Sequence, residues 1–280
     1  MRNLAGFILP AVVMLAAVAI FPSLYLIWMS LHYWIVFQPE VSFNGLGNFR
    51  HLLASPDFQA AVRVTAVYLA ATTTLTLALG FALALVLTEE IRGRGVLRAI
   101  FTLPLVVPPV VAGFAWKFTL NREVGVIGAY LLPRLGVEVS LLGHPTWALV
   151  SVLVADVWSK TSFMFLVLLA GLQSIPSEVR EAAVIDGVSR WQEVRFVILP
   201  LMLPVMLVAT VFRLLDGINT FDLIYVLTRG GPGTATQTLS ILGWKIGFQY
   251  FDLGQAAALA IVMLVVVIAM GFPLMRRLVV

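Results

Sequence analysis

The sequence predicts an all-α membrane protein that crosses the bilayer several times. Of its 280 residues, 61% are hydrophobic and 11% are charged, whereas soluble domains carry about 25% charged residues. The apolar residues gather in six segments, each about as long as the roughly 20 helical residues that span a bilayer. Charged residues concentrate between these segments, and no soluble domain is visible there. We therefore expect one transmembrane domain over residues 1–280.

The six predicted spans differ in how they begin and in their proline content. The first follows Arg2 and is too long for the roughly 7–15-residue apolar core of a signal peptide, so we expect it to be retained. Prolines in the first and third spans, including Pro108 and Pro109, predict kinks, because neighbouring helices can satisfy the carbonyls that a proline frees. The approximate ranges are 5–30, 62–87, 99–119, 147–171, 195–215 and 255–275.

Arginine placement predicts the orientation in the membrane. One set of connections is short and dense in arginine, and the other set spreads its basic residues over longer loops. Because arginine-rich loops face the cytoplasm, we expect both termini and the 172–194 segment to be cytoplasmic. The dense set contains Arg2, Arg92, Arg94, Arg98, Arg180, Arg190, Arg195, Arg276 and Arg277.

The most polar stretch lies between the fourth and fifth spans, from Pro176 to Pro200, and holds four acids and three arginines. Gly187 is a natural helix stop, and Ser189 followed by Gln192 matches a capping box. These signals predict a short helix over about 177–188, a break, and a second helix that runs into the fifth span. On the residues alone, the first helix either docks on a partner or forms an ordinary solvated loop.

The same stretch resembles the EAA motif in the membrane subunits of bacterial ABC importers. The resemblance rests on Glu181-Ala182-Ala183, Gly187 and the ending Val197-Ile198-Leu199-Pro200, in which valine replaces the usual isoleucine. In that family the segment is the coupling helix, which docks on an ATPase subunit. The resemblance implies an ATPase contact through Glu181, Ala182, Ala183, Asp186, Gly187 and Pro200.

A second resemblance covers most of the C-terminal half. The string from Phe221-Asp222 to Gly230-Gly231-Pro232 is similar to carbohydrate ABC permeases, specifically the maltose-permease-like member of each pair. This implies the six-span type I importer permease fold and transport of a di- or oligosaccharide, such as trehalose or maltose, by alternating access. The implied partners are a second homologous permease, two ATP-binding cassette ATPase subunits and an extracytoplasmic sugar-binding protein.

Two pairs of charges lie inside the predicted spans, where a charge costs about 2.5–3.5 kcal/mol on insertion scales. Asp156 and Lys160 are four residues apart, and Arg213 and Asp216 are three apart, so each pair shares a helix face. They either form internal salt bridges or line a shared aqueous cavity that binds sugar hydroxyls. The resemblance favours the cavity and also matches Leu105 and Pro109. The candidate substrate-binding residues are Asp156, Ser159, Lys160, Phe163, Arg213, Asp216, Gly217 and Thr220.

Other functions have less support in the sequence. There is no cysteine and therefore no disulfide or thiolate metal site, and no catalytic set or metal site is apparent. The Gly230-Gly231-Pro232-Gly233 run lacks the lysine of a P-loop, so we expect partner ATPases to bind ATP and Mg. Topology explains the net charge of +4 better than nucleic acid binding does. A polyol or glycerol phosphate permease and, with no internal repeat visible, a stand-alone secondary transporter are the alternatives.

Overall fold

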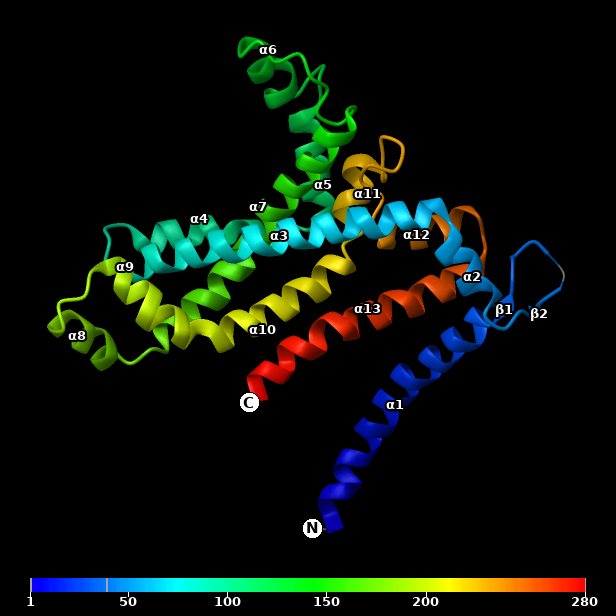
Figure 1. Cartoon of the computed structure of the whole chain (residues 1–280), viewed down its shortest axis with the longest axis horizontal. Coiled ribbons are helices and arrows are strands. Elements are labelled where there is room, and N and C mark those ends of the chain that lie inside the picture. The colour runs from blue at the N-terminus through cyan, green and yellow to red at the C-terminus, as the bar shows by residue number, and fades with distance from the viewer. Residues whose placement is uncertain (1, 39, 280) are drawn as a thin grey trace. The chain divides into compact units, whose positions relative to one another are not determined.

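The computed structural model describes residues 2–38 and 40–279 (Figure 1), so the two ends of the predicted domain, Met1 and Val280, lie outside it. Among the described residues, the regular elements are helices apart from two short strands, which confirms the all-α prediction. The elements are α1 Arg2–Ser30, β1 His32–Tyr33, β2 Ser42–Phe43, α2 Gly47–Ala54, α3 Pro56–Thr88, α4 Arg94–Val106, α5 Pro109–Leu120, η1 Val126–Leu131 (a π-helix), α6 Leu132–Arg134, α7 Pro145–Gln173, α8 Ser177–Ile185, α9 Arg190–Gln192, η2 Glu193–Ile198 (π), α10 Leu199–Ile218, α11 Asp222–Thr228, α12 Leu239–Trp244, η3 Lys245–Gln249 (π) and α13 Leu253–Val279.

Long apolar helices occupy five of the six predicted spans. Among the described residues, the helices long and apolar enough to cross a membrane are Ile8–Ser30, Pro56–Thr88, Pro145–Gln173, Arg190–Ile218 and Leu253–Arg276. The sixth predicted span is different, because α4 and α5 meet at an angle of 99°. The described residues contain six candidate spans if this bent pair counts as one.

The third span is therefore broken, and its prediction as one kinked helix over 99–119 is corrected here. Val107 (φ −75°, ψ 120°) and Pro108 (φ −57°, ψ 140°) are both extended. A residue that precedes proline avoids the helical region because it clashes with the proline ring, and the Pro108-Pro109 pair imposes this restriction twice in succession. Pro109 then begins α5, at a position where the missing N–H removes no helical hydrogen bond.

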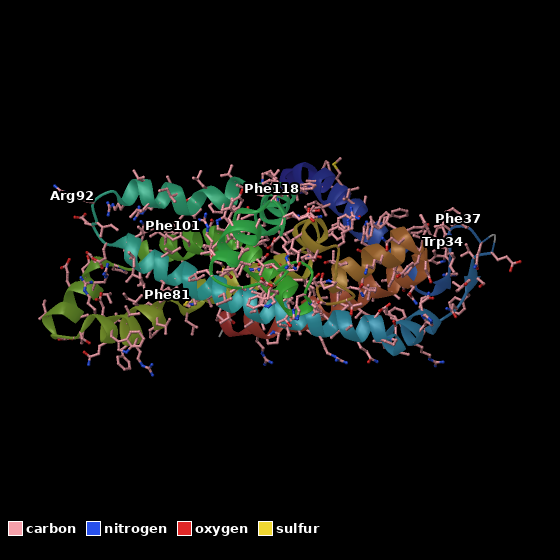
Figure 2. All side chains as sticks on the ribbon, turned by 90° about the horizontal axis from the view of Figure 1, so that it is seen from above. Trp34, Phe37, Phe81, Arg92, Phe101 and Phe118 are labelled. Carbon is pink, nitrogen blue, oxygen red and sulfur yellow. The ribbon has the colours of Figure 1, made fainter. Side chains whose placement is uncertain are left out.

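The chain forms two compact units, and each is considered by itself. The first comprises Met1–Gln59 and Leu242–Val266. In it, β1 and β2 pair antiparallel, and the Asn48 side-chain amide donates to the carbonyls of Ser30 and His32, both at 2.8 Å. Trp34 and Phe37 lie beside this hairpin (Figure 2), and the Phe37 ring packs edge-on against Phe251, with 4.8 Å between centroids.

The second unit comprises Ala60–Ile241 and Val267–Val280 and contains all the candidate site residues. Its apolar core lies where α3, α7 and the start of α10 meet, and it includes the buried Leu87, Phe165 and Met202. Figure 2 shows Phe81 on α3 and Phe101 on α4, with Arg92 in the loop that joins these two helices. The Phe101 ring packs edge-on against Phe165, with 6.5 Å between centroids.

Gly80 allows α3 and α7 to approach closely. A Cβ atom at this position would lie 2.8 Å from the Met164 Cβ and 2.9 Å from the Phe165 backbone nitrogen. Overpacking costs about 1–3 kcal/mol, and about 2–4 °C of melting temperature corresponds to each kcal/mol. We expect Gly80→Ala to lower the thermal stability of the purified protein by several degrees. Gly95→Ala, in α4 with no atom within 4 Å of its Cβ, is the control, and an equal effect of both substitutions would contradict this explanation.

Candidate functional site

A buried ion pair joins α7 to α10. The Arg213 guanidinium on α10 contacts the Asp156 carboxylate on α7, and their side chains are 1% and 0% exposed. The Tyr68 hydroxyl on α3 donates to the Asp156 Oδ1 at 2.7 Å. Asp156 is thus held by two other helices, which is the usual way for a charge to persist inside a membrane bundle.

Asp216 extends this network towards solvent. Its carboxylate accepts from the Arg213 Nη1 at 3.2 Å, which confirms the predicted pair along one helix face. It also accepts from the Lys160 Nζ at 3.0 Å, across from α7. The Asp216 side chain is 45% exposed and that of Lys160 is 24% exposed. The network therefore extends from the buried pair of Arg213 and Asp156 to the partly exposed pair of Lys160 and Asp216.

The salt bridge between Asp156 and Lys160, one of the alternatives that the spacing along α7 allowed, is not formed. Asp156 faces Arg213 and Tyr68, whereas Lys160 bonds to Asp216 on the neighbouring helix. The buried guanidinium of Arg213 needs a carboxylate partner inside the bundle, and Asp156 provides it. Lys160, one turn further along α7, is left for the more exposed Asp216.

A cavity of about 200 Å³ lies beside this network. Five of the eight candidate substrate-binding residues line it together: Asp156, Ser159, Lys160, Asp216 and Thr220. The remaining lining residues are Pro109, Leu215, Asn219, Phe221, Asp222 and Leu223. Carboxylates, an ammonium, an amide and hydroxyls thus surround a small space, which suits a ligand with many hydrogen-bonding groups.

Three candidates do not line this cavity. Arg213 lies behind Asp216 and is buried. Gly217 packs against Leu69 and Arg213. A Cβ at Gly217 would lie 2.7 Å from the Leu69 Cδ2 and 3.2 Å from the Arg213 Nη1. Gly217 therefore makes room for the helix packing and the guanidinium. Phe163 is half-buried on α7, and neither it nor Leu105 is among the lining residues.

Tyr68, Asn219 and Asp222 were not among the candidate substrate-binding residues predicted from the sequence. A signal for Tyr68 was present, because Thr65, Tyr68, Thr72 and Thr76 recur at helical spacing within an apolar span. All four are buried on α3. Such a polar stripe indicates the face of a membrane helix that looks into the bundle.

The segment predicted to couple the chain to a partner forms a helix, a break and a second helix, as expected. The first helix, α8, ends at Ile185, and Gly187 follows with φ +70°. The Ser189 side chain accepts from the Gln192 backbone N–H, and the Gln192 side chain accepts from the Ser189 N–H, which confirms the capping box. Pro200 lies in the first turn of α10.

Most of the candidate coupling residues are exposed. Glu181, Ala182, Asp186, Gly187 and Pro200 face solvent, whereas Ala183 is 6% exposed. Ile185, at the end of α8, is 84% exposed. The small residues around Ile185 leave the backbone of α8 accessible to a partner.

Residues 76–279 match the family described as "Binding-protein-dependent transport system inner membrane component". The chain belongs to this family. It is a transmembrane permease subunit of an ABC importer, a multi-pass membrane protein from a transport family and not from an enzyme family. The predicted family and fold are confirmed.

Several relatives of this permease are curated transport proteins. It is 40% identical to the trehalose/maltose transport system permease protein MalF of Thermococcus litoralis, over 94% of this chain and 88% of the relative. It is 35% identical to the trehalose transport system permease protein SugA of Mycobacterium tuberculosis, over 94% and 84%. It is 34% identical to the sn-glycerol-3-phosphate transport system permease protein UgpA of Agrobacterium fabrum, over 82% and 78%.

Solved structures share the fold of this permease over nearly its whole length. One is a bacterial ABC transporter involved in the import of the acidic polysaccharide alginate, with a TM-score of 0.82 and 25% identity, over 98% of this chain and 96% of the other. Another is an alginate transporter bound to its pentasaccharide-loaded periplasmic protein, with a TM-score of 0.84 and 23% identity, over 98% and 92%.

Proposed function

We propose that this permease carries a neutral di- or oligosaccharide, such as trehalose or maltose, past the cavity between α7 and α10. One observation supports a neutral ligand: both basic side chains near the cavity are already paired with carboxylates. Lys160 lies 3.0 Å from Asp216, and Arg213 contacts both Asp156 and Asp216. Asp222 adds a third acid to the lining. Among the described residues near the cavity, no basic side chain is left unpaired to bind a phosphate, and the carboxylates there would repel it.

Sugar hydroxyls fit this lining better than an anion does. Each hydroxyl both donates and accepts, so it can donate to Asp216 or Asp222 and accept from the Asn219 amide. Relatives named for trehalose and maltose, for glycerol phosphate and for an acidic polysaccharide share this family or fold. Family membership alone therefore admits neutral and anionic ligands, and the local charges favour the neutral class.

We further propose the assembly in which this permease works. A second homologous permease completes the pathway, an extracytoplasmic binding protein delivers the sugar, and two ATPase subunits bind ATP and Mg and hydrolyse the nucleotide. The exposed surface of α8, with Ile185 and Glu181, supports docking on an ATPase. Arginine-rich connections on the same side support a cytoplasmic position for α8 and for both termini. Alternating access then moves the cavity from one face of the membrane to the other.

The substrate class is tested by reconstituting the permease with its partner subunits and measuring ATP-dependent uptake of labelled trehalose, maltose and glycerol 3-phosphate. We expect uptake of at least one disaccharide and little of the phosphate ester. Uptake of glycerol 3-phosphate in excess of both disaccharides would contradict the proposal.

Substitutions in the ion pair of Lys160 and Asp216 distinguish a role in sugar binding from a purely structural role. We expect Lys160→Ala and Asp216→Ala each to lower sugar uptake about fivefold, because each removes a charge-assisted hydrogen bond at the cavity. Lys160→Ala should lower thermal stability little, since partly exposed ion pairs contribute about 0–1 kcal/mol. Asp216→Ala also removes a contact of the buried Arg213 and should lower it more. Glu90→Ala, an exposed acid outside the cavity, is the control. A large loss of stability with normal uptake by the surviving protein would show that the pair only holds the bundle.

A further inference from the structure

A cluster of four charges joins α8 to the ends of two spans. The Arg180 Nε on α8 donates to the Glu193 Oε1, and its Nη2 donates to the Glu89 Oε1, both at 3.0 Å. Glu89 directly follows α3, and Glu193 begins η2, which continues into α10. Figure 1 shows α8 and α9 beside the loop that joins α3 to α4. One guanidinium thus bridges three elements.

The contacts of Arg180 favour the ionised forms of Arg180 and Glu89. The hydrogen bond from Arg180 lowers the pKa of Glu89, and the hydrogen bond to Glu193 raises the pKa of Arg180. The Glu193 side chain is 6% exposed and that of Arg180 is 30% exposed. A guanidinium that binds two carboxylates through separate N–H groups fixes their geometry, which a single ammonium cannot do.

Apolar packing behind α8 is thin. Among the α8 side chains that the structure describes, Ala183 is the buried one. An apolar crevice of about 370 Å³ and a more open hollow of about 540 Å³ lie around the charge cluster. Both are lined by Glu89, Arg180, Arg190 and Glu193. Because apolar stabilisation grows with buried area, the ion cluster is the firmer connection between α8 and the spans.

We propose that Arg180 is a positioning residue that transmits the displacement of α8 to α3 and α10 through Glu89 and Glu193. The inference rests on the proposed docking of α8 on an ATPase. The two helices that receive the displacement also carry the cavity network, with Tyr68 on α3 and Asp216 on α10. About 20 residues of helix, or about 30 Å, separate the charge cluster from that network. Rigid helices can carry a movement over this distance.

Arg190 provides a matched control within the same cluster. It contacts the same two carboxylates, at 3.1 Å from Glu89 and 3.6 Å from Glu193. However, it lies on α9, which runs directly into η2, and its side chain is 76% exposed. Arg190→Met therefore removes the same kind of charge without detaching α8.

The test uses the assembled complex and two measurements. The first is the number of sugar molecules imported per ATP hydrolysed, and the second is hydrogen exchange of the amides in residues 177–188. We expect Arg180→Met to lower the number of sugar molecules imported per ATP about fivefold and to speed hydrogen exchange in residues 177–188 about tenfold. The reason is that the substitution removes two hydrogen bonds between charged groups. Arg180→Lys should lie between Arg180→Met and the wild type, and Arg190→Met should match the wild type.

Each outcome decides the inference. A normal transport ratio with normal exchange in Arg180→Met would overturn it, and so would equal losses in Arg180→Met and Arg190→Met. If Arg180→Met fails to assemble, Glu89→Gln, which weakens one arm of the bridge, should still lower the ratio and speed the exchange. A wild-type complex that imports no neutral sugar would count against the proposed function only, because the exchange measurement still tests the role of Arg180.

Discussion

Replacing Arg213 with methionine is expected to lower the melting temperature of the purified permease by about 10 °C, the largest stability loss that we expect from any single substitution. The substitution leaves the Asp156 carboxylate buried and without its cation, and the Tyr68 hydroxyl remains as its hydrogen-bond donor. Breaking a buried pair from one side costs about 3–5 kcal/mol. Because the chain has no cysteine, a thiol-reactive dye cannot report its unfolding. Size-exclusion chromatography after heating, or tryptophan fluorescence, measures it instead.

A double variant tests the cause of this loss. Asp156→Asn combined with Arg213→Met removes both charges and leaves an amide oxygen that can still accept from Tyr68. Neutral replacements of whole buried ion pairs are often tolerated, so we expect the double variant to regain more than half of the lost stability. If the double variant is no more stable than Arg213→Met alone, the loss reflects missing packing around the arginine stem and not an uncompensated charge.

The intramembrane charges form two kinds of ion pair. The pair between Asp156 and Arg213 is dry and joins α7 to α10, as expected for a structural salt bridge. The pair between Lys160 and Asp216 borders the cavity and is partly exposed. Because Asp216 bonds to both basic residues, a ligand that engages Asp216 also alters the environment of the buried pair. Under the proposed function, Asp216 would therefore couple ligand binding to stability.

Local signals in the sequence predicted the local structure well. The break after α8 follows from the positive φ of Gly187, and the restart follows from the capping box of Ser189 and Gln192. Five spans follow from apolar length alone. The bend of 99° between α4 and α5 was underestimated, because two adjacent prolines show that a helix is interrupted but not the direction in which the chain resumes.

Contacts between helices were harder to predict. Spacing along α7 allowed a bond between Asp156 and Lys160, but each side chain found its partner on another helix. Tyr68 lies 88 residues from Asp156 in the chain, so no local pattern could join them. Gly217 stands on the expected face of α10, where its lack of a side chain makes room for Leu69 and Arg213. Such assignments depend on which helices are neighbours, and helical periodicity does not contain that information.

Gly187→Val is expected to lower ATP-driven sugar uptake about five- to thirtyfold, while the complex still assembles and hydrolyses ATP. Gly187 has φ +70°, and a Cβ there would meet no atom within 4 Å. Glycine is therefore favoured here by its backbone conformation, and not by a lack of space for a side chain within this chain. A left-handed conformation costs a residue with a side chain about 1–2 kcal/mol, and about 1.4 kcal/mol corresponds to a factor of ten in an equilibrium. Valine should shift the end of α8 and displace Ile185 and Asp186 from the docking surface.

Gly187→Asn separates backbone conformation from surface shape. Asparagine enters the left-handed region more readily than most residues, so it preserves the turn while adding a side chain of similar size to valine. If conformation is the cause, Gly187→Asn should keep uptake within about threefold of the wild type. If asparagine is as harmful as valine, the ATPase needs a bare surface at this position and the backbone explanation is wrong. The turn at Gly187 lies between α8 and α9. Uptake per ATP and hydrogen exchange of α8 would then be measured in both variants. Together they would show whether the substitution disturbs the docking of α8 or the transmission of its movement through Arg180.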